Sequence, residues 1–241
     1  MENEQIRQAV ILLGGRGTRI SELYPDRPKA LVPVAGRTIL EWQLDWLLRN
    51  GFTHIHLAAG HMADVLQVWL ETHPQVGLTI TCSVENVPLG TGGAIKFVED
   101  YLVSDTFYVL NGDSLAPNLS FQSLENLPMV GNDITAPSIT IAVARIEETG
   151  RYGSVEFDES GRVSAFLEKS ERESGWINTG VYRMNRAVLD LIEPNVKLSI
   201  ETEIFPRLVE QKLVFAHCCE PPLLDMGTPD GLAEMEVFLL R

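Results

Sequence analysis

Short apolar segments alternate with helical ones over residues 9–110, and this alternation limits the fold more than any other feature. The apolar segments have the length of strands, and helical segments of about ten residues separate them. Crossovers of this kind join strands that run parallel. The expected strands are 9–13, 54–59, 78–84 and 107–110, and the expected helices are 38–51, 63–71 and 93–101. The pattern therefore predicts an α/β, Rossmann-like fold with a mixed, mainly parallel sheet flanked by helices.

The second half of the chain has a different pattern, in which strands follow one another with few helices between them. Strand-like segments occupy 138–145, 153–157, 162–167 and 176–183, and helices are expected at 200–211 and 230–239. The segment Asp158-Glu159-Ser160-Gly161 has the composition of a hairpin turn. No linker separates the halves, so the sequence predicts one domain over 1–241 whose latter half adds a strand-rich lobe.

The first apolar segment leads directly into the loop sequence LLGGRGTRI, residues 12–20. Its glycines permit a sharp bend or the close approach of a ligand, and its arginines indicate that the ligand is an anion. Backbone N–H groups in a loop after a strand can bind phosphates. The loop is not a dinucleotide fingerprint, because Ile20 stands where a third glycine is required, and it lacks the Gly-Lys-Ser/Thr of a Walker loop. We therefore predict an anion site of another kind.

The charge of the chain excludes two classes of partner. Its 19 Lys and Arg residues against 33 Asp and Glu give a formal charge of −14. This argues against binding to nucleic acid and to an anionic membrane surface. Five cations nevertheless fall within residues 16–37 beside only two acids, which agrees with a local anion site.

The cysteines and the N-terminus indicate a cytoplasmic protein. Cys82, Cys218 and Cys219 form no metal-ligand spacing and are expected to be reduced thiols. The N-terminus has neither the basic start nor the apolar stretch of a signal peptide. No apolar run approaches the ~20 residues that span a bilayer.

Seven segments, in order along the chain, resemble those of the sugar-1-phosphate nucleotidyltransferases. The glycine loop with Pro28, Lys29 and Pro33 is similar to the family signature L-x-G-G-x-G-T-R-L…P-K-x-x-x-P, with Ile20 in place of the last leucine. The other similar segments are the base loop Pro88-Leu89-Gly90-Thr91-Gly92-Gly93-Ala94, the metal turn Asn111-Gly112-Asp113, the sugar-binding positions Tyr152-Gly153, Glu168-Lys169 and Asn178-Thr179-Gly180, and the second metal segment Leu224-Asp225-Met226-Gly227-Thr228-Pro229. The resemblance covers nearly all of residues 8–240 and implies the GT-A-like fold of this family.

The resemblance also implies a reaction between a nucleoside triphosphate and a sugar 1-phosphate. The sugar phosphate attacks the α-phosphorus, and pyrophosphate leaves in line. Both reactants are polyanions, so catalysis would consist of positioning and charge neutralisation. The implied catalytic residues are Arg19 on the departing β,γ-phosphates, Lys29 near the α-phosphate, and Asp113. Asp113 and Asp225 would hold Mg²⁺ as hard oxygen ligands.

The remaining implied positions bind the two substrates. The nucleotide-binding positions are Leu13, Gly14, Gly15, Gly17, Thr18, Glu85, Gly90 and Thr91. The sugar-phosphate-binding positions are Asn111, Gly153, Glu168, Lys169, Asn178 and Thr179. Residues of about 8–115 would form the nucleotide-binding half, and residues of about 116–241 the sugar-binding half.

Glu85, three residues before Pro88, bears on the choice of base. A carboxylate only accepts hydrogen bonds, and guanine offers it two adjacent donors, N1–H and the 2-amino group. Loop 85–93 is similar to loops of guanylyltransferases for mannose and heptose 1-phosphates, and Ser199-Ile200-Glu201 looks most like the heptose branch. The predicted pair is GTP with heptose or mannose 1-phosphate. The alternative is a uridylyl- or thymidylyltransferase for a hexose or amino-sugar 1-phosphate, because uridylyltransferases of amino sugars share much of this loop.

Two other classes are less favoured. A non-catalytic nucleotide-binding relative would be expected to lack some of Arg19, Lys29, Asp113 and Asp225, and all four are present. A dinucleotide-dependent oxidoreductase would need the missing third glycine and an acid after the second strand. The chain is expected to be monofunctional, without the C-terminal β-helix of some relatives, and the sequence leaves open whether it forms a homo-oligomer.

Overall fold

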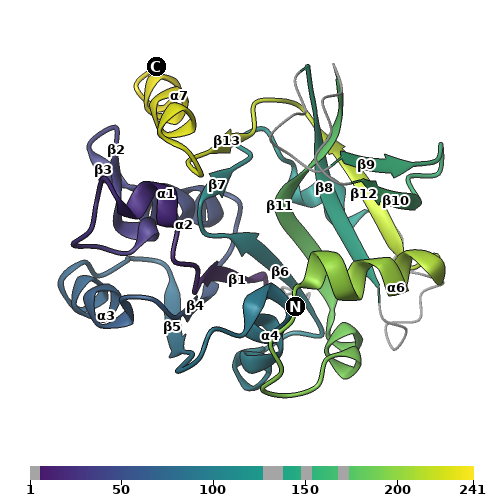
Figure 1. Ribbon diagram of the computed structural model, residues 1–241, viewed down its shortest axis with the longest axis horizontal. Helices are drawn as coiled ribbons and strands as arrows, with labels where there is room; N and C mark the ends of the chain where they lie inside the picture. The colour runs from purple at the N-terminus through teal and green to yellow at the C-terminus, as the bar shows by residue number, and fades with distance from the viewer. Residues whose placement is uncertain (1–5, 127–137, 148–153, 168–173) are drawn as a thin grey trace, which may run out of the picture.

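The structure is a computed structural model that describes residues 6–126, 138–147, 154–167 and 174–241. Its main sheet has nine strands in the order β10-β9-β11-β6-β1-β4-β5, with β8 paired to β11 and to β12 (Figure 1). The strands are β1 (Gln8–Leu13), β4 (His54–Ala59), β5 (Thr79–Val84), β6 (Thr106–Asn111), β8 (Ile139–Ile146), β9 (Ser154–Phe157), β10 (Val163–Leu167), β11 (Gly175–Asn185) and β12 (Val214–Cys219). The predicted α/β class with a mixed, mainly parallel sheet is confirmed.

Strand β1 lies at the centre of the parallel part of the sheet. It pairs in parallel with β4 on one side and with β6 on the other, and β4 pairs in parallel with β5. The register places Leu12 beside Asn111 and Leu13 beside Ala59. The loops that follow these strands therefore leave the sheet at the same edge, where open α/β sheets bind ligands.

Helices cover both faces of this part of the sheet. Side chains that alternate along β1 enter two separate clusters: Ile11 packs with α2 (Ile39–Arg49), and Val10 packs with Ile95 of α4 (Gly90–Phe97). Helix α3 (Ala63–Thr72) joins the first cluster through Leu66. Apolar residues on both faces of the strands are what a covered parallel sheet requires.

Local sequence explains where two of these helices begin. Thr38 caps α2, since its side chain accepts from the amide of Glu41 while the Glu41 carboxylate accepts from the amide of Thr38. Helix α4 begins at Gly90, three residues before the expected start at residue 93, and ends at Phe97. A separate 3₁₀ turn, η2 (Glu99–Tyr101), follows it. Short pieces connect these elements: α1 (Thr18–Ser21), η1 (Lys29–Leu31), β2 (Pro33–Val34), β3 (Arg37–Thr38), β7 (Ser114–Leu115) and α5 (Phe121–Glu125).

Strand β11 joins the two halves of the sheet. It runs antiparallel to β6 over residues 181–185 and to β8 along both of its ends, with a bulge between Asn178 and Tyr182. The expected hairpin turn is present, because the amide of Gly161 donates to the carbonyl of Asp158 at 2.9 Å. Strand β12, which the sequence did not predict, pairs in parallel with β8.

The expected helix at 200–211 is two elements. A π-helical turn, η5 (Ile200–Ile204), precedes α6 (Phe205–Glu210), and a 3₁₀ segment, η4 (Arg186–Leu191), lies before both. Pro206 explains the break, because proline has no amide with which to continue the hydrogen bonds of the preceding turn and fits the first turn of a new helix.

The C-terminal segment returns to the first half of the molecule. Strand β13 (Leu224–Asp225) lies beside β7 and pairs antiparallel with it (Figure 1). Helix α7 (Pro229–Leu239) places Met235 in the same cluster as α2. The side chain of Thr228 accepts from the amide of Gly231 and so caps α7. None of the helices in the described ranges combines the length and apolar character needed to cross a bilayer.

A buried histidine on β4 makes the stability of this fold depend on pH. The His56 ring is fully buried, with Nδ1 2.8 Å from Thr81 Oγ1 and Nε2 2.9 Å from Ser83 Oγ. Burial lowers the pKa of His56 to about 4. The unfolded chain has an ordinary histidine pKa of ~6.5 and binds a proton first as the pH falls.

We predict that the free energy of unfolding falls by up to ~3 kcal/mol between pH 6.5 and pH 4 through His56 alone. This stability is fully present above pH 6.5, where the His56 ring is neutral in both the folded and the unfolded chain. It is lost as the pH falls toward 4, because the unfolded chain then binds a proton that the buried ring does not bind. Urea denaturation at several pH values measures it. His56→Gln should remove this part of the slope, and His73→Gln, on the surface, should retain it. Identical slopes for His56→Gln and the wild type would contradict the assignment.

Candidate active site

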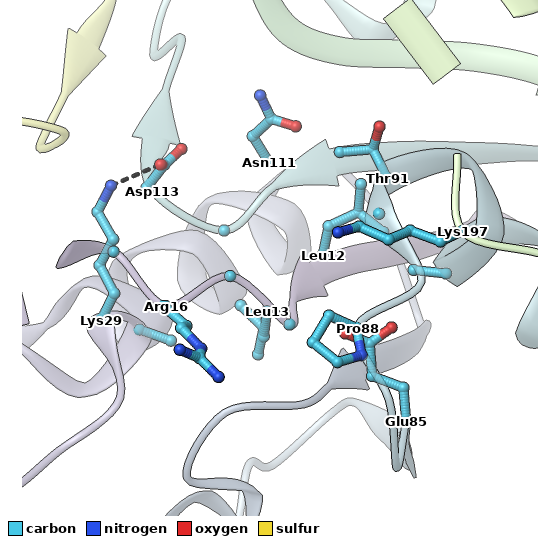
Figure 2. A pocket seen from close by; sticks show the side chains of 17 residues that line it. Leu12, Leu13, Arg16, Lys29, Glu85, Pro88, Thr91, Asn111, Asp113 and Lys197 are labelled. Carbon is cyan, nitrogen blue, oxygen red and sulfur yellow. Dashed lines mark hydrogen bonds and ion pairs between the residues drawn. The ribbon is translucent and has the colours of Figure 1, made fainter. Parts of the chain in front are cut away.

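A cavity of about 610 Å³ opens at the edge of the sheet where β1 and β6 end (Figure 2). This volume lies within the range of small-molecule sites. Ten of the sequence-predicted site residues line it: Leu13, Gly14, Gly15, Gly17, Lys29, Glu85, Gly90, Thr91, Asn111 and Asp113. Leu12, Arg16, Ala30, Pro88, Ala94, Gly112 and Lys197 complete the lining. The structure therefore gathers side chains and backbone from the glycine loop, the base loop and the metal turn around one space.

The glycine loop forms one wall with its backbone. A Cβ on Gly14 would lie 2.5 Å from Oε1 of Glu85, so a side chain there would displace this carboxylate. Gly17 has a φ of +52° and lies against the aliphatic part of Lys29. Among the described residues, the amides of Gly15, Arg16 and Gly17 donate to no protein acceptor. Such amides are suited to binding phosphate oxygens.

Lys29 and Asp113 form an ion pair at one end of the cavity. Nζ of Lys29 lies 2.6 Å from Oδ2 of Asp113, and the two side chains are 15% and 36% exposed (Figure 2). Lys29 begins the 3₁₀ turn η1, directly after Pro28, and Asp113 follows β6. The pair therefore places one cationic and one anionic side chain side by side at this end of the cavity.

Asp225 reaches the same region through the pairing of β13 with β7. Asp225 is the register partner of Ser114, and the amide of Met226 donates to the carbonyl of Asp113 at 3.0 Å. The amide of Gly227 donates to Oδ1 of Asp225 at 2.7 Å and orients this carboxylate. The structure therefore brings together the backbones of two aspartate segments that the sequence places 112 positions apart, although Asp225 itself is not among the residues that line the cavity.

These two carboxylates suit Mg²⁺ better than a softer metal. In the described part of the chain no three His, Cys, Asp or Glu side chains cluster as metal ligands. Mg²⁺ is commonly bound by one or two carboxylates together with substrate phosphates and water. Asp113 and Asp225 therefore fit a metal that arrives with a phosphorylated substrate.

A buried glutamine, which the sequence interpretation missed, supports the Asp113 turn. Gln43 of α2 is fully buried, and its Nε2 donates to the carbonyls of Asn111 and Ser114 at 2.8 and 2.9 Å. These carbonyls lie on either side of Asp113. The signal was available, because Gln43 falls three residues after Leu40 on the apolar face of the predicted helix.

Glu85 and Lys197 lie at the other end of the cavity, with Thr91 and Pro88 (Figure 2). Burial raises the pKa of the Glu85 carboxyl, and the hydrogen bond from the Leu89 amide partly opposes this shift. Lys197, which the sequence interpretation did not select, presents an ammonium group with no hydrogen bond or ion pair to any described residue. This end of the cavity thus offers both an acceptor and a donor.

The predicted sugar-binding residues are only partly described. Asn178 and Thr179 lie at the bulge of β11, where Gly180 has a φ of +76° and contacts the side chain of Asn111. Neither of the two lines the cavity itself. Gly153, Glu168 and Lys169 lie outside the described residues.

The two arginines of the glycine loop differ in position. Arg16 lines the cavity and points into the space between Lys29 and Leu13 (Figure 2). Arg19 and Thr18 belong to the short helix α1, are exposed, and are not among the lining residues. The role predicted for Arg19 stays a prediction, and Arg16 is a second candidate for the same task.

Comparison with known proteins gives the family. Residues 8–241 match the family described as nucleotidyl transferase. The chain belongs to the nucleotidyl transferase family. A match of this length includes the glycine loop, the Asp113 turn and the Asp225 segment, so the family's match covers every part of the cavity described above.

The curated relatives of this nucleotidyl transferase are longer than the chain itself. It is 35% identical over 238 residues to mannose-1-phosphate guanyltransferase beta-B of Xenopus laevis, covering 96% of this chain and 64% of the relative. It is 33% identical over 236 residues to mannose-1-phosphate guanylyltransferase of Mycobacterium tuberculosis, covering 97% and 64%. The chain therefore spans slightly less than two thirds of these proteins.

Solved structures match over almost their whole length. HddC from Yersinia pseudotuberculosis superposes with a TM-score of 0.85 and 27% identity, covering 97% of this chain and 100% of that one. The same protein complexed with GMP-PN gives a TM-score of 0.83. A putative glucose-1-phosphate thymidylyltransferase from Bacillus anthracis, at 20% identity and a TM-score of 0.81 over 97% of this chain and 95% of that one, shares the fold.

We predict that Gln43→Met lowers stability and also loosens the Asp113 turn. Two carbonyls would lose their donor, at a cost of ~1–3 kcal/mol for each group left unsatisfied. The matched control is Gln8→Met. Gln8 is also buried and bonds to Tyr101 and Val103, but it begins β1 and is far along the strand from the cavity.

Both variants should lose stability in urea denaturation, but only Gln43→Met should weaken the binding of a nucleoside triphosphate with Mg²⁺ by titration calorimetry. Equal affinities of the two variants for the nucleotide would show that Gln43 serves the core alone.

Proposed function

We propose that this chain transfers the nucleoside monophosphate group of a nucleoside triphosphate to a sugar 1-phosphate and releases pyrophosphate. The observation that carries the proposal is the position of the Lys29–Asp113 ion pair beside the Asp225 segment, at one end of a cavity walled by loop amides that have no acceptor in the described part of the chain. An acceptor and a donor for a base lie at the opposite end. One nucleotide fits between the two ends with its phosphates at the ion pair.

The chain's own groups suit an in-line transfer between two polyanions. An oxygen of the sugar phosphate forms a bond to the α-phosphorus, and the bond to the β-phosphate bridging oxygen breaks. Arg16 and the loop amides are placed to hold the triphosphate, while Lys29 carries a positive charge to the reacting phosphate. Neutralising charge that develops in the transition state is the main contribution available to such a site.

Asp113 and Asp225 would hold Mg²⁺ together with the phosphates of the substrate. When bound, the metal supplies a divalent positive charge that polarises the phosphate and aligns both substrates. Asp113 has a second carboxylate oxygen besides the one that faces Lys29, so it can contact a cation without losing the lysine. Gln43 and the Met226 amide keep the backbone of this turn in place.

The donor and acceptor at the far end support guanine as the base. The Glu85 carboxylate can accept from N1–H and the 2-amino group, and the Lys197 ammonium can donate to O6. Uracil and thymine present acceptors on both sides of a single donor, and a carboxylate would face at least one of them. The relatives named mannose-1-phosphate guanylyltransferases support the same choice.

For the sugar we propose mannose 1-phosphate or a heptose 1-phosphate. Mannose 1-phosphate follows from the names of the relatives. The heptose follows from the resemblance of Ser199-Ile200-Glu201 to that branch. Pyrophosphate release, measured for GTP, UTP, dTTP, CTP and ATP against several sugar 1-phosphates, tests both choices. No release with any pair would contradict the proposal.

We predict that Asp113→Asn and Asp225→Asn fold normally but lose turnover. Loss of one well-placed electrostatic group costs on the order of 10²–10³ in rate, and loss of a metal ligand costs at least as much. Asp230→Asn, an exposed aspartate of the nearby helix α7, is the matched control and should retain activity. Full activity of the wild type in EDTA would contradict the metal assignment.

We predict that Glu85→Gln lowers kcat/KM for GTP by roughly 10- to 100-fold. The amide keeps the shape of the side chain but presents a donor to one of guanine's donors, and an unpaired buried polar group costs ~1–3 kcal/mol. UTP and dTTP should lose less or gain, so the ratio of kcat/KM values is the quantity to measure. A wild type that prefers UTP or dTTP, or a ratio that does not change, would exclude guanine recognition by Glu85.

A further inference from the structure

Glu201 stands between the base end of the cavity and the bulge of β11. Its carboxylate accepts hydrogen bonds from three hydroxyl groups: Oε2 accepts from Thr91 at 2.6 Å and from Ser199 at 2.8 Å, and Oε1 accepts from Tyr182 at 3.3 Å. Glu201 lies on the π-helical turn η5, far along the chain from the base loop. Nothing in the proposed reaction uses it so far.

On one side, Glu201 fixes the base loop. Thr91 lines the cavity at the start of α4 and also accepts from the amide of Ile200 at 2.9 Å (Figure 2). The amides of Gly92 and Gly93 donate to the carbonyl of Leu198 at 3.1 and 3.4 Å. The first turn of α4 therefore takes its position from residues 198–201.

On the other side, Glu201 fixes the bulge that carries the predicted sugar-binding residues. The Tyr182 hydroxyl accepts from Nδ2 of Asn178 at 2.7 Å, and Oδ1 of Asn178 accepts from the amide of Gly180 at 2.9 Å. Gly180 lies against the side chain of Asn111, which lines the cavity. The path Thr91–Glu201–Tyr182–Asn178 thus begins at a residue that lines the cavity and ends at the β11 bulge, where Gly180 lies behind the lining residue Asn111.

The chemistry of the path gives it one direction. A carboxylate can only accept, so the Thr91, Ser199 and Tyr182 hydroxyls must all point toward Glu201. Tyr182 is then left with a lone pair for Asn178, whose amide orientation is fixed in turn. Within the described ranges Glu201 forms no ion pair, so hydroxyl groups alone compensate its charge. An apolar side chain of similar volume would fill the space that Glu201 occupies, but it would position neither Thr91 nor the β11 bulge.

We propose that Glu201 is a positioning residue that couples the nucleotide and sugar subsites, so that a bound nucleotide raises the affinity for the sugar 1-phosphate. The inference rests on the proposed function. A nucleotide that fixes Thr91 also fixes Glu201, Tyr182 and Asn178, and the sugar phosphate then meets a site that is already ordered. Coupling of this kind is reciprocal, so the sugar phosphate should raise nucleotide affinity by the same factor.

The test measures this factor directly. Titration calorimetry gives Kd for mannose 1-phosphate, or for the sugar 1-phosphate that the substrate panel selects. It is run without and with a saturating, non-reacting α,β-methylene GTP and Mg²⁺. The wild type should bind the sugar phosphate at least ~5-fold more tightly in the presence of the analogue. In Glu201→Gln the factor should fall close to one, because the amide cannot accept from all three hydroxyls.

Glu203→Gln is the matched control. Glu203 lies two residues further on the same turn, is exposed, and among the described residues accepts only from the Ser199 amide, so its substitution should leave the factor unchanged. Thr91→Val and Tyr182→Phe each remove one hydroxyl without changing side-chain shape, and either should lower the factor even if Glu201→Gln folds poorly. The double variant that combines Thr91→Val with Tyr182→Phe should lower the coupling factor no further than the more damaging single substitution, since one broken hydrogen bond already interrupts the path.

The outcomes separate the two proposals. A wild type that binds the nucleotide but none of the sugar 1-phosphates, and releases no pyrophosphate, contradicts the proposed function. If the wild type catalyses transfer but the nucleotide analogue changes its affinity for the sugar 1-phosphate by a factor near one, only the coupling is contradicted. The same holds if Glu201→Gln retains the factor, or if Glu203→Gln loses it equally.

Discussion

The close contact between the ends of β1 and β6 is the constraint from which the cavity follows. The amide of Gly112 donates to the carbonyl of Leu12 at 3.1 Å, and a Cβ on Gly112 would lie 2.6 Å from that oxygen. Only glycine fits there, so only glycine lets the two strands end this close together. The glycine loop and the Asp113 turn therefore leave the sheet as neighbours. One contributes amides that have no acceptor among the described residues, and the other contributes a carboxylate, so the two groups that the proposed function assigns to a phosphate and its cation come from neighbouring loops.

The local charge of the cavity then differs from that of the whole molecule. The chain carries a formal charge of −14, yet Arg16, Lys29 and Lys197 all line this one space. An acidic surface would repel a nucleoside triphosphate at long range, but screening at physiological salt limits that repulsion to about 8 Å. Inside the cavity the cations and loop amides decide the sign of the potential. The Lys29–Asp113 ion pair compensates both of these charges within the cavity.

The sequence predicted well what depends on local pattern. The first-half strands are confirmed to within one residue, because buried apolar runs and glycine stops are local signals. Lys29, Asp113 and Glu85 were chosen through resemblance, and the structure places all three at the cavity. Gln43 and Lys197 were missed, since their role depends on which distant backbone or cavity each one meets. Strand β12 was also missed, although its buried residues Val214, Phe215 and Ala216 form a short apolar run like those of the strands that were predicted. Its position beside β8 could not be read from the sequence, because the pairing partners Ile139 and Val214 lie 75 residues apart.

The glycines of the base loop show most clearly why the second half of the chain cannot be separated from the first. From sequence they were assigned to a base-binding loop through resemblance alone. In the structure a Cβ on Gly90 or Gly93 would instead collide with the carbonyl oxygen of Leu198 or Val196. These glycines are needed for the approach of the chain's own residues 196–198, which also bring Lys197 to the cavity. The base end is therefore built by packing between the two halves. Its shape depends on residues 196–198, which belong to the second half of the chain.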